Sequence, residues 1–275
     1  MKIKSTSSNI VIYLIIIIGV IIFLFPLYLL IIWSFQSTSE IFSFPPKLIP
    51  GSNFIENFSM LRIKMDVYRT ILNSVFITTI TVIGQLFFAS LAGFAFAKYT
   101  FKGKRILFAL LIATMTIPFQ ATVIPLYIIM QKLNLGNTYA SVILPGLTPA
   151  FGVFLMRQSI KQIVHNDLID AGRLDGATEF GIYFRIVLPV LKPTLAALGM
   201  IFALGTWNNF FWPLIILTTR EMLTVTVALA NILGVYEMPY GALMLGSFIS
   251  LLPILVLFLF LQKYFIRGLT VGSFR

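Results

Sequence analysis

The sequence has 275 residues, of which 59% are hydrophobic and only 11% are charged, and its mean hydropathy is +0.97. Because a soluble domain carries about 25% charged residues, this composition excludes a water-soluble globular protein. The net charge of +11 could indicate a nucleic-acid-binding protein. The basic residues instead fall between apolar segments, as the positive-inside rule describes. We therefore expect the chain to contact the lipid bilayer and not a nucleic acid.

Six segments without Asp, Glu, Lys or Arg predict an all-α fold, a polytopic membrane bundle of six transmembrane helices. Each segment exceeds the roughly 20 residues that a helix needs to cross about 30 Å of hydrocarbon. Their apolar residues run continuously instead of alternating, which favours helices over the strands of a β-barrel. The predicted spans, within a single membrane domain of residues 1–275, cover 10–33, 72–97, 106–130, 138–156, 194–217 and 242–262.

The basic residues between the spans predict that both termini are cytoplasmic. In this orientation an external loop covers residues 34–71, the longest inner segment covers 157–192 and a cytoplasmic tail covers 263–275. Inner segments of membrane proteins carry an excess of Lys and Arg, and here they hold all but six of the 20 basic residues. The external six are Lys47, Arg62, Lys64, Arg69, Lys132 and Arg220.

Prolines lie inside the third and fourth predicted spans. Pro118 and Pro125 fall in the third, and Pro145 and Pro149 fall in the fourth. A proline leaves a backbone carbonyl without its helical donor, and lipid cannot supply one, so neighbouring helices or a wet cavity must. The broken helices therefore either kink for packing or line a transport pathway.

The sequence offers no catalytic chemistry. It has no cysteine and a single histidine, His165, which cannot form a metal cluster alone. It contains no Gly-rich phosphate loop with its lysine, and none of the predicted spans holds a charge of the kind that proton-coupled carriers place inside the bundle. We therefore expect no catalytic, cofactor or metal residues and no enzymatic activity in this chain.

The inner segment 157–192 is unusual because it holds four of the nine acidic residues, Asp167, Asp170, Asp175 and Glu179. Apolar residues recur in it at intervals of three, which predicts an amphipathic helix that Gly176 interrupts with a turn. A helix lying on lipid would favour Lys and Arg over these acids. We therefore expect a docking surface for a cytoplasmic partner. The recurring apolar residues are Leu168, Ala171, Leu174, Ala177 and Phe180, followed by the aromatic Tyr183 and Phe184.

This segment resembles the EAA loop of bacterial ABC importer permeases, whose pattern is E-A-A-x-x-D-G-A followed about nine residues later by I-x-L-P. Two positions depart from the pattern. Asp170 replaces the glutamate and keeps its charge on a shorter arm, and Gly172 replaces the second alanine and weakens the helix by roughly 1 kcal/mol. The matching residues are Asp170, Ala171, Gly172, Asp175, Gly176 and Ala177, then Ile186, Leu188 and Pro189.

The resemblance implies that the loop forms a coupling helix seated in a cleft of a separate ATPase. It also implies a second homologous permease subunit, a dimer of ATP-binding subunits at the cytoplasmic face, an external solute-binding protein and location in the inner membrane of a bacterium. ATP and Mg would be bound by the ATPase, with no cofactor in this chain. The implied ATPase-coupling residues are Asp170, Ala171, Gly172, Asp175, Gly176, Ala177, Phe180 and Pro189.

Three further stretches are similar to the smaller permease subunit of maltose-type carbohydrate importers. They are GTWNNFFWPLIILT from Gly205, TVTVALAN from Thr224 and QKYFIRGLTVGSFR from Gln262. The resemblance implies import of a carbohydrate or of a related polyol or glycerol phosphate. A self-sufficient secondary carrier or channel is the alternative, and a membrane scaffold without transport is a third.

One polar and aromatic cluster lies within the predicted spans, at Trp207, Asn208 and Asn209. Aromatic rings and amides are common sugar ligands, so these residues are candidates for the solute pathway. Alternatively, Trp207 and Trp212 anchor the chain at the membrane interface and the asparagines join helices.

Overall fold

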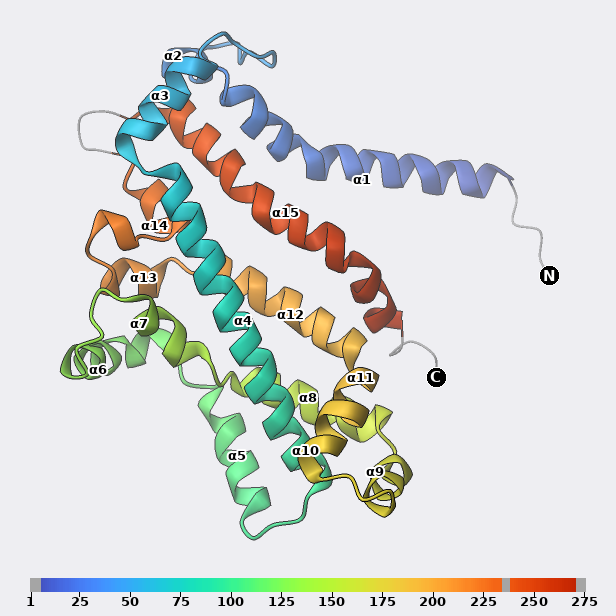
Figure 1. The fold of residues 1–275 in the computed structure, drawn as a ribbon. Coiled ribbons are helices and arrows are strands. Elements are labelled where there is room, and N and C mark those ends of the chain that lie inside the picture. The colour runs from blue at the N-terminus through green and yellow to red at the C-terminus, as the bar shows by residue number, and fades with distance from the viewer. Residues whose placement is uncertain (1–5, 234–237, 271–275) are drawn as a thin grey trace. The chain divides into compact units, whose positions relative to one another are not determined.

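The computed structural model describes residues 6–233 and 238–270, and the regular elements in this part of the chain are all helical (Figure 1). Most are α-helices, while η1 and η3 are short 3-10 turns and η2 is a π-helix. In chain order the elements are α1 (Thr6–Trp33), α2 (Thr38–Ile41), α3 (Phe54–Lys64), α4 (Val67–Lys98), α5 (Lys104–Thr114), α6 (Phe119–Lys132), α7 (Tyr139–Ile143), η1 (Leu144–Gly146), α8 (Ala150–Ile163), α9 (Asn166–Leu174), α10 (Glu179–Ile182), η2 (Tyr183–Val187), α11 (Leu188–Val190), α12 (Lys192–Trp207), α13 (Phe211–Ile216), η3 (Arg220–Met222), α14 (Val225–Ala230) and α15 (Tyr240–Thr270).

Within residues 6–233 and 238–270, three helices are long and apolar enough to cross a membrane alone. Three further candidates are pairs of shorter helices joined at a break, so up to six spans result when each bent pair counts as one. The straight helices are Ile10–Trp33, Val67–Lys98 and Tyr240–Phe260. The bent pairs are Lys104–Thr114 with Phe119–Lys132, Tyr139–Gly146 with Ala150–Ile163, and Glu179–Val190 with Lys192–Trp207, bent by 100°, 43° and 80°.

Two of these breaks fall at prolines noted in the sequence. Pro118 and Pro149 both have extended backbone and immediately precede α6 and α8. At the second break the side-chain amide of Gln85 on α4 donates to the carbonyl of Gly146 at 2.9 Å. A carbonyl released inside a membrane must find such a protein donor because lipid offers none.

The helix expected over residues 194–217 is interrupted in the structure. Helix α12 ends at Trp207, and α13 starts as a separate short helix at Phe211. The side-chain amide of Asn208 bonds back to the carbonyl of Leu204 at 3.0 Å, a local bond that competes with helix continuation. In addition, Pro213 has no N–H for a continuous helical ladder.

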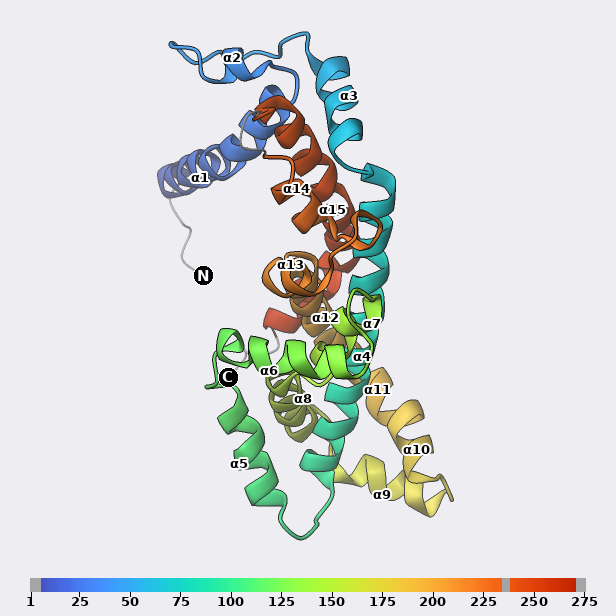
Figure 2. The same ribbon diagram turned by 90° about the vertical axis from the view of Figure 1, so that its left-hand side faces the viewer.

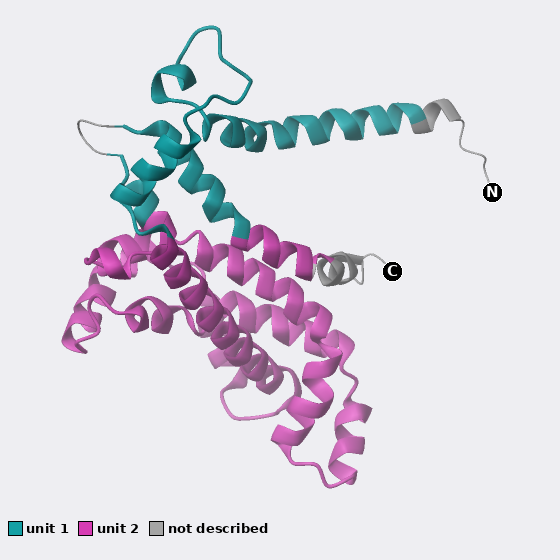
Figure 3. Cartoon of the chain, turned by 45° about the horizontal axis from the view of Figure 1, so that its top comes forward, with its two compact units in different colours: residues 1–67, 228–252 teal, residues 68–227, 253–275 magenta. Residues whose placement is uncertain are grey.

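The described chain separates into two compact units (Figure 3). Unit 1 comprises residues 1–67 and 228–252, and unit 2 comprises residues 68–227 and 253–275. Within unit 1, the most apolar 18-residue window of α1 has no buried residue, as expected of a helix surrounded by lipid. The amide of Asn57 on α3 donates to the carbonyls of Ser34 and Gln36, both at 2.9 Å, and so satisfies backbone groups that follow α1.

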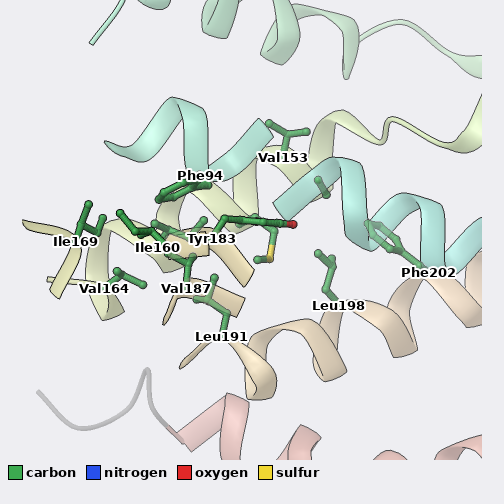
Figure 4. Packing of buried hydrophobic residues seen from close by; sticks show 13 residues of the cluster. Phe94, Val153, Ile160, Val164, Ile169, Tyr183, Val187, Leu191, Leu198 and Phe202 are labelled. Carbon is green, nitrogen blue, oxygen red and sulfur yellow. The ribbon is translucent and has the colours of Figure 1, made fainter. Parts of the chain in front are cut away.

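The main core of unit 2 lies between α4, α8, α12 and the inner segment (Figure 4). Phe94 of α4, Ile160 of α8 and Leu198 of α12 are buried in it. Tyr183 of η2 also enters this core and places its ring centroid 5.8 Å from that of Phe94. The hydroxyls of Tyr183 and Ser90 lie 2.7 Å apart, so the buried tyrosine has a polar partner.

Candidate functional site

Residues 166–182 of unit 2 form two short helices joined by a tight turn, which we call the α9–α10 hairpin (Figures 1 and 2). Helix α9 ends because Gly176 takes a φ of +75°, a conformation that glycine adopts at little cost. The N–H of Ala177 bonds to the carbonyl of Gly172 at 2.9 Å, which closes the helix end. Thr178 then caps α10 by accepting from the N–H of Gly181 at 3.1 Å. The turn predicted at Gly176 is confirmed.

One side of the hairpin packs into the core of unit 2. Ile169 is 3% exposed, and Gly172 is buried as well. A Cβ atom on Gly172 would lie 2.8 Å from Cδ1 of Ile186 and 3.2 Å from Cγ1 of Ile182. Gly172 is therefore more than a weakened helical position, because it lets α9 approach the helix that follows.

Other positions of the hairpin present apolar side chains to its surroundings. Leu168 is 43% exposed, Leu174 is 89% exposed and Phe180 is 65% exposed. These residues belong to the apolar series predicted from the three-residue spacing, and the chain leaves them uncovered. Exposed apolar residues gathered on one element are typical of an interaction surface.

A charged cluster connects the two arms of the hairpin to the end of α4. The guanidinium of Arg173 donates to Oε1 of Glu179 at 2.8 Å, and its Nη1 lies 3.3 Å from Oδ1 of Asp170. The hydroxyl of Tyr99 donates to Oε2 of the same Glu179. The ammonium group of Lys98 donates to Oδ1 of Asn166 at 2.7 Å, at the start of α9.

The protonation states at this cluster follow from its geometry. The hydrogen bond that Arg173 donates to the carboxylate of Glu179 raises the pKa of Arg173 above its ordinary value, so the guanidinium is charged. Burial, followed by the hydrogen bond to Glu179, raises the pKa of Tyr99 to about 12. The Tyr99 hydroxyl therefore keeps its proton at neutral pH and donates it to the carboxylate. Because Arg173 and Glu179 are each more than two-fifths exposed, solvent screening makes these contacts orienting more than stabilising.

The structure brings most of the predicted coupling residues together on the hairpin. Asp170, Ala171, Asp175, Gly176 and Phe180 are exposed there. The remaining three lie differently: Ala177 is half-buried, Gly172 faces the core, and Pro189 is exposed beyond η2 in α11.

Sequence reasoning did not find Tyr99, Lys98 or Ser90 as partners of the inner segment. Tyr99 and Glu179 are separated by 80 positions, and no spacing rule links them. The one available signal was position, since Lys98 and Tyr99 directly precede the basic inner turn of the chain.

The predicted pathway residues have three different environments. Trp207 is 6% exposed, and Asn208 is exposed at the end of α12. Asn209 is half-buried, and its carbonyl accepts from the hydroxyl of Thr226 at 3.2 Å. The neighbouring Trp212 is buried and donates from its indole to the carbonyl of Ser141 at 2.8 Å, so it joins two helical segments instead of anchoring at an interface.

Among the described residues, no group of three or more His, Asp or Glu side chains could hold a metal ion.

Comparison with known proteins gives a consistent result. Residues 85–271 match the family model described as "Binding-protein-dependent transport system inner membrane component". The arabinooligosaccharides transport system permease protein AraQ of Halalkalibacterium halodurans is 41% identical over 252 residues, which is 90% of each chain. The lactose transport system permease protein LacG of Rhizobium radiobacter is 32% identical, with 91% of this chain and 90% of that one covered. The fold resembles a chain of a bacterial ABC transporter that imports the polysaccharide alginate, with a TM-score of 0.82, 23% identity, and coverage of 96% of this chain and 100% of that one.

Proposed function

Since the chain belongs to the family of binding-protein-dependent transport system inner membrane components, we propose that its α9–α10 hairpin couples it to a separate ATPase and that it imports a carbohydrate. The chain is a permease subunit of an ATP-binding-cassette importer. The coupling role and the solute are the proposed parts, and each is supported by a different observation.

The exposed apolar side of the hairpin carries the coupling proposal. An ATPase can move the membrane helices only if it contacts them differently in its two states, and such contacts need a protruding element that does not bend. The hairpin extends from the rest of unit 2 (Figure 2), and its turn is closed by the hydrogen bond from the N–H of Ala177 to the carbonyl of Gly172. Leu174 and Phe180 supply the uncovered apolar surface, and Asp170 beside them supplies a charge that a basic residue of the partner can meet.

The proposed assembly has four kinds of component. We infer a second, homologous permease, a dimer of ATP-binding subunits on the hairpin side and a solute-binding protein on the opposite face. ATP and Mg²⁺ belong to the ATPase, because this sequence contains no Gly-rich phosphate loop to hold them. In this assembly the present chain performs no chemistry itself.

The identity of the solute is inferred from the relatives. The two relatives described above are named for oligosaccharide and lactose transport and cover nine-tenths of the chain. Within the chain, Asn208 is the candidate solute contact, because its exposed amide lies at the interruption between α12 and α13. Trp207 and Trp212 are buried and support this interruption instead.

The coupling proposal is tested by co-purification of the full chain with its partner permease and ATPase. Gly176→Trp places a bulky side chain on the exposed turn, so we expect loss of the ATPase while membrane insertion persists. Gly103→Trp is the matched control, since both glycines have positive φ and no neighbouring atom within 4 Å of an added Cβ. Full retention of the ATPase by Gly176→Trp would contradict the proposal. Transport without any ATPase would instead favour a self-sufficient carrier, and ligand binding to the partner solute-binding protein would distinguish sugars from polyols and glycerol phosphates.

A further inference from the structure

An open cleft of about 610 Å³ lies in unit 2 between the start of α5 and helix α8. The start of α5 lies at the end of unit 2 where α4 finishes, which is also the end that carries α9 and α10 (Figures 1 and 2). The coupling role of the hairpin does not use this cleft. Its lining combines cationic side chains, Lys104, Arg105 and Arg157, with the apolar Phe101, Ile106 and Phe108.

The three cations reach the cleft from two different helices. Lys104 and Arg105 occupy the first turn of α5, and Arg157 comes from α8. The guanidinium carbon of Arg157 lies 4.0 Å from the ring centroid of Phe108, and its Nε donates to the carbonyl of Phe96 at 3.3 Å. These contacts fix the guanidinium in the cleft. In the described part of the chain none of the three cations forms an ion pair with a carboxylate.

The start of α5 adds to this positive charge. Gly103 precedes the helix without a side-chain cap, and the first turn contains no acidic residue. The free N–H groups of a helix N-terminus carry a partial positive charge. The positive side chains of Lys104 and Arg105 lie in that turn and are repelled by this charge. An anion in the cleft would relieve this repulsion and the repulsion among the three cations together.

The apolar part of the cleft indicates what carries that anion. Ile106 lines the cleft and is 67% exposed, and the apolar surface continues along α5 through Leu107, 52% exposed, and Leu110, 58% exposed. In a predicted membrane span this flank faces lipid. A soluble anion would have no use for it, and an acidic protein surface would not extend along the hydrocarbon.

We propose that this cleft binds an anionic phospholipid of the membrane leaflet on the hairpin side. The phosphate accepts from Lys104, Arg105 and Arg157, and an acyl chain follows Ile106 and Leu110 along α5. Basic pockets between membrane helices are a known type of lipid headgroup site. Here the lipid would connect α5 to α8 at their inner ends.

Native mass spectrometry of the purified full-length chain, with phosphatidylglycerol or phosphatidylcholine added in detergent, tests the proposal. Wild type should retain phosphatidylglycerol in preference. Removing one surface cation weakens attraction to anionic lipid by about fivefold, so Lys104→Gln with Arg105→Gln should reduce retention by roughly 25-fold. Lys132→Gln, which removes an exposed cation outside the cleft, should leave retention unchanged.

Three results would overturn the proposal. Equal retention of the two lipids would show that the charge is not recognised, and equal retention by the double variant and wild type would show that the lipid binds elsewhere. Complete displacement of phosphatidylglycerol by millimolar inorganic phosphate would indicate a site for a soluble anion. Arg157→Lys keeps the charge while changing the contact with Phe108, so its retention of the lipid distinguishes loss of charge from loss of folding.

Discussion

Tyr99, the residue that follows α4, donates its hydroxyl hydrogen to the carboxylate of Glu179 in the first turn of α10. The α9–α10 hairpin is therefore attached to α4 directly, in addition to its covalent path through η2 and α11 into α12. Lys98 makes a second attachment to Asn166 at 2.7 Å. Force applied to the hairpin can thus reach two membrane helices at once.

Loss of the Tyr99 hydroxyl should weaken the coupling of ATP hydrolysis to transport. Tyr99→Phe keeps the ring and leaves the ion pair between Arg173 and Glu179 in place. A hydrogen bond to a charged group contributes about 1.5–3 kcal/mol, and less at an exposed site, so we expect two- to fivefold less solute imported per ATP hydrolysed. Parallel assays of uptake and phosphate release in proteoliposomes measure this ratio.

Tyr127→Phe removes a hydroxyl from an exposed tyrosine of α6 and should leave the ratio of uptake to hydrolysis at its wild-type value. An unchanged ratio in Tyr99→Phe would show that α4 is not driven through this contact. Loss of the ATPase from the complex would instead place Tyr99 in docking.

Two substitutions at Gly176 distinguish the need for its backbone conformation from the need for open space around it. A left-handed conformation costs a non-glycine residue about 1–2 kcal/mol, but asparagine tolerates it. Gly176→Val should therefore reduce both ATPase co-purification and transport, whereas Gly176→Asn should preserve the turn. Equal losses in the two variants would indicate that the partner needs the space above Gly176 and not its φ of +75°.

The paired hydroxyls of Ser90 and Tyr183 should respond unequally to mutation. Ser90 also lies 2.6 Å from the carbonyl of Leu86 and donates to it, which leaves Tyr183 as the donor to Ser90. Ser90→Ala leaves the buried hydroxyl of Tyr183 without its acceptor and should cost about 1–3 kcal/mol of unfolding free energy. Tyr183→Phe removes that donor and should cost less.

Denaturation of the four members of this double-mutant cycle in detergent measures the asymmetry. The double variant should be no less stable than Ser90→Ala alone. Additive losses would mean that the two hydroxyls do not depend on each other.

Variants of Asn208 and Trp212 should affect different properties, with Asn208 affecting solute binding and Trp212 affecting protein stability. Asn208→Ala removes an exposed amide and should raise the solute concentration for half-maximal uptake a few-fold, about the effect of one net hydrogen bond, at normal protein yield. Trp212→Phe leaves the carbonyl of Ser141 without its indole donor and should lower the melting temperature. Reversal of the two effects would place the solute path beside Trp212.

The membrane character of the chain and the turn at Gly176 could be predicted because each depends on local sequence. Charge-free length predicts a span, and a glycine within an amphipathic series predicts a turn. The interruption after Trp207 was missed because Asn208 and Pro213 both lie within a long stretch without charged residues. A prediction based on the composition of such a stretch does not detect single residues that break a helix.

The candidate site was predictable only in part. The exposed series from Leu168 to Phe180 follows from spacing, but its outward direction does not, because spacing does not say which face the chain itself covers. Ile169 and Gly172 define the covered face, and their partners Ile182 and Ile186 are brought to them by η2. No spacing rule in a single sequence pairs Tyr99 with Glu179, which lies 80 positions later.

The π-helix η2 sets the direction of the hairpin by residue count. A π-helical turn holds one residue more than an α-helical turn, and η2 occupies Tyr183–Val187, between α10 and α11. If the same five residues of η2 formed a regular α-helix instead, everything before them would rotate by about 100° relative to α12, which is the rotation of one α-helical residue. Leu174 and Phe180 would keep their chemistry and their mutual spacing, yet point away from any partner that fits the present chain. Compatibility between this permease and an ATPase is therefore sensitive to whether η2 keeps its π-helical turn, although none of its residues is a proposed coupling contact.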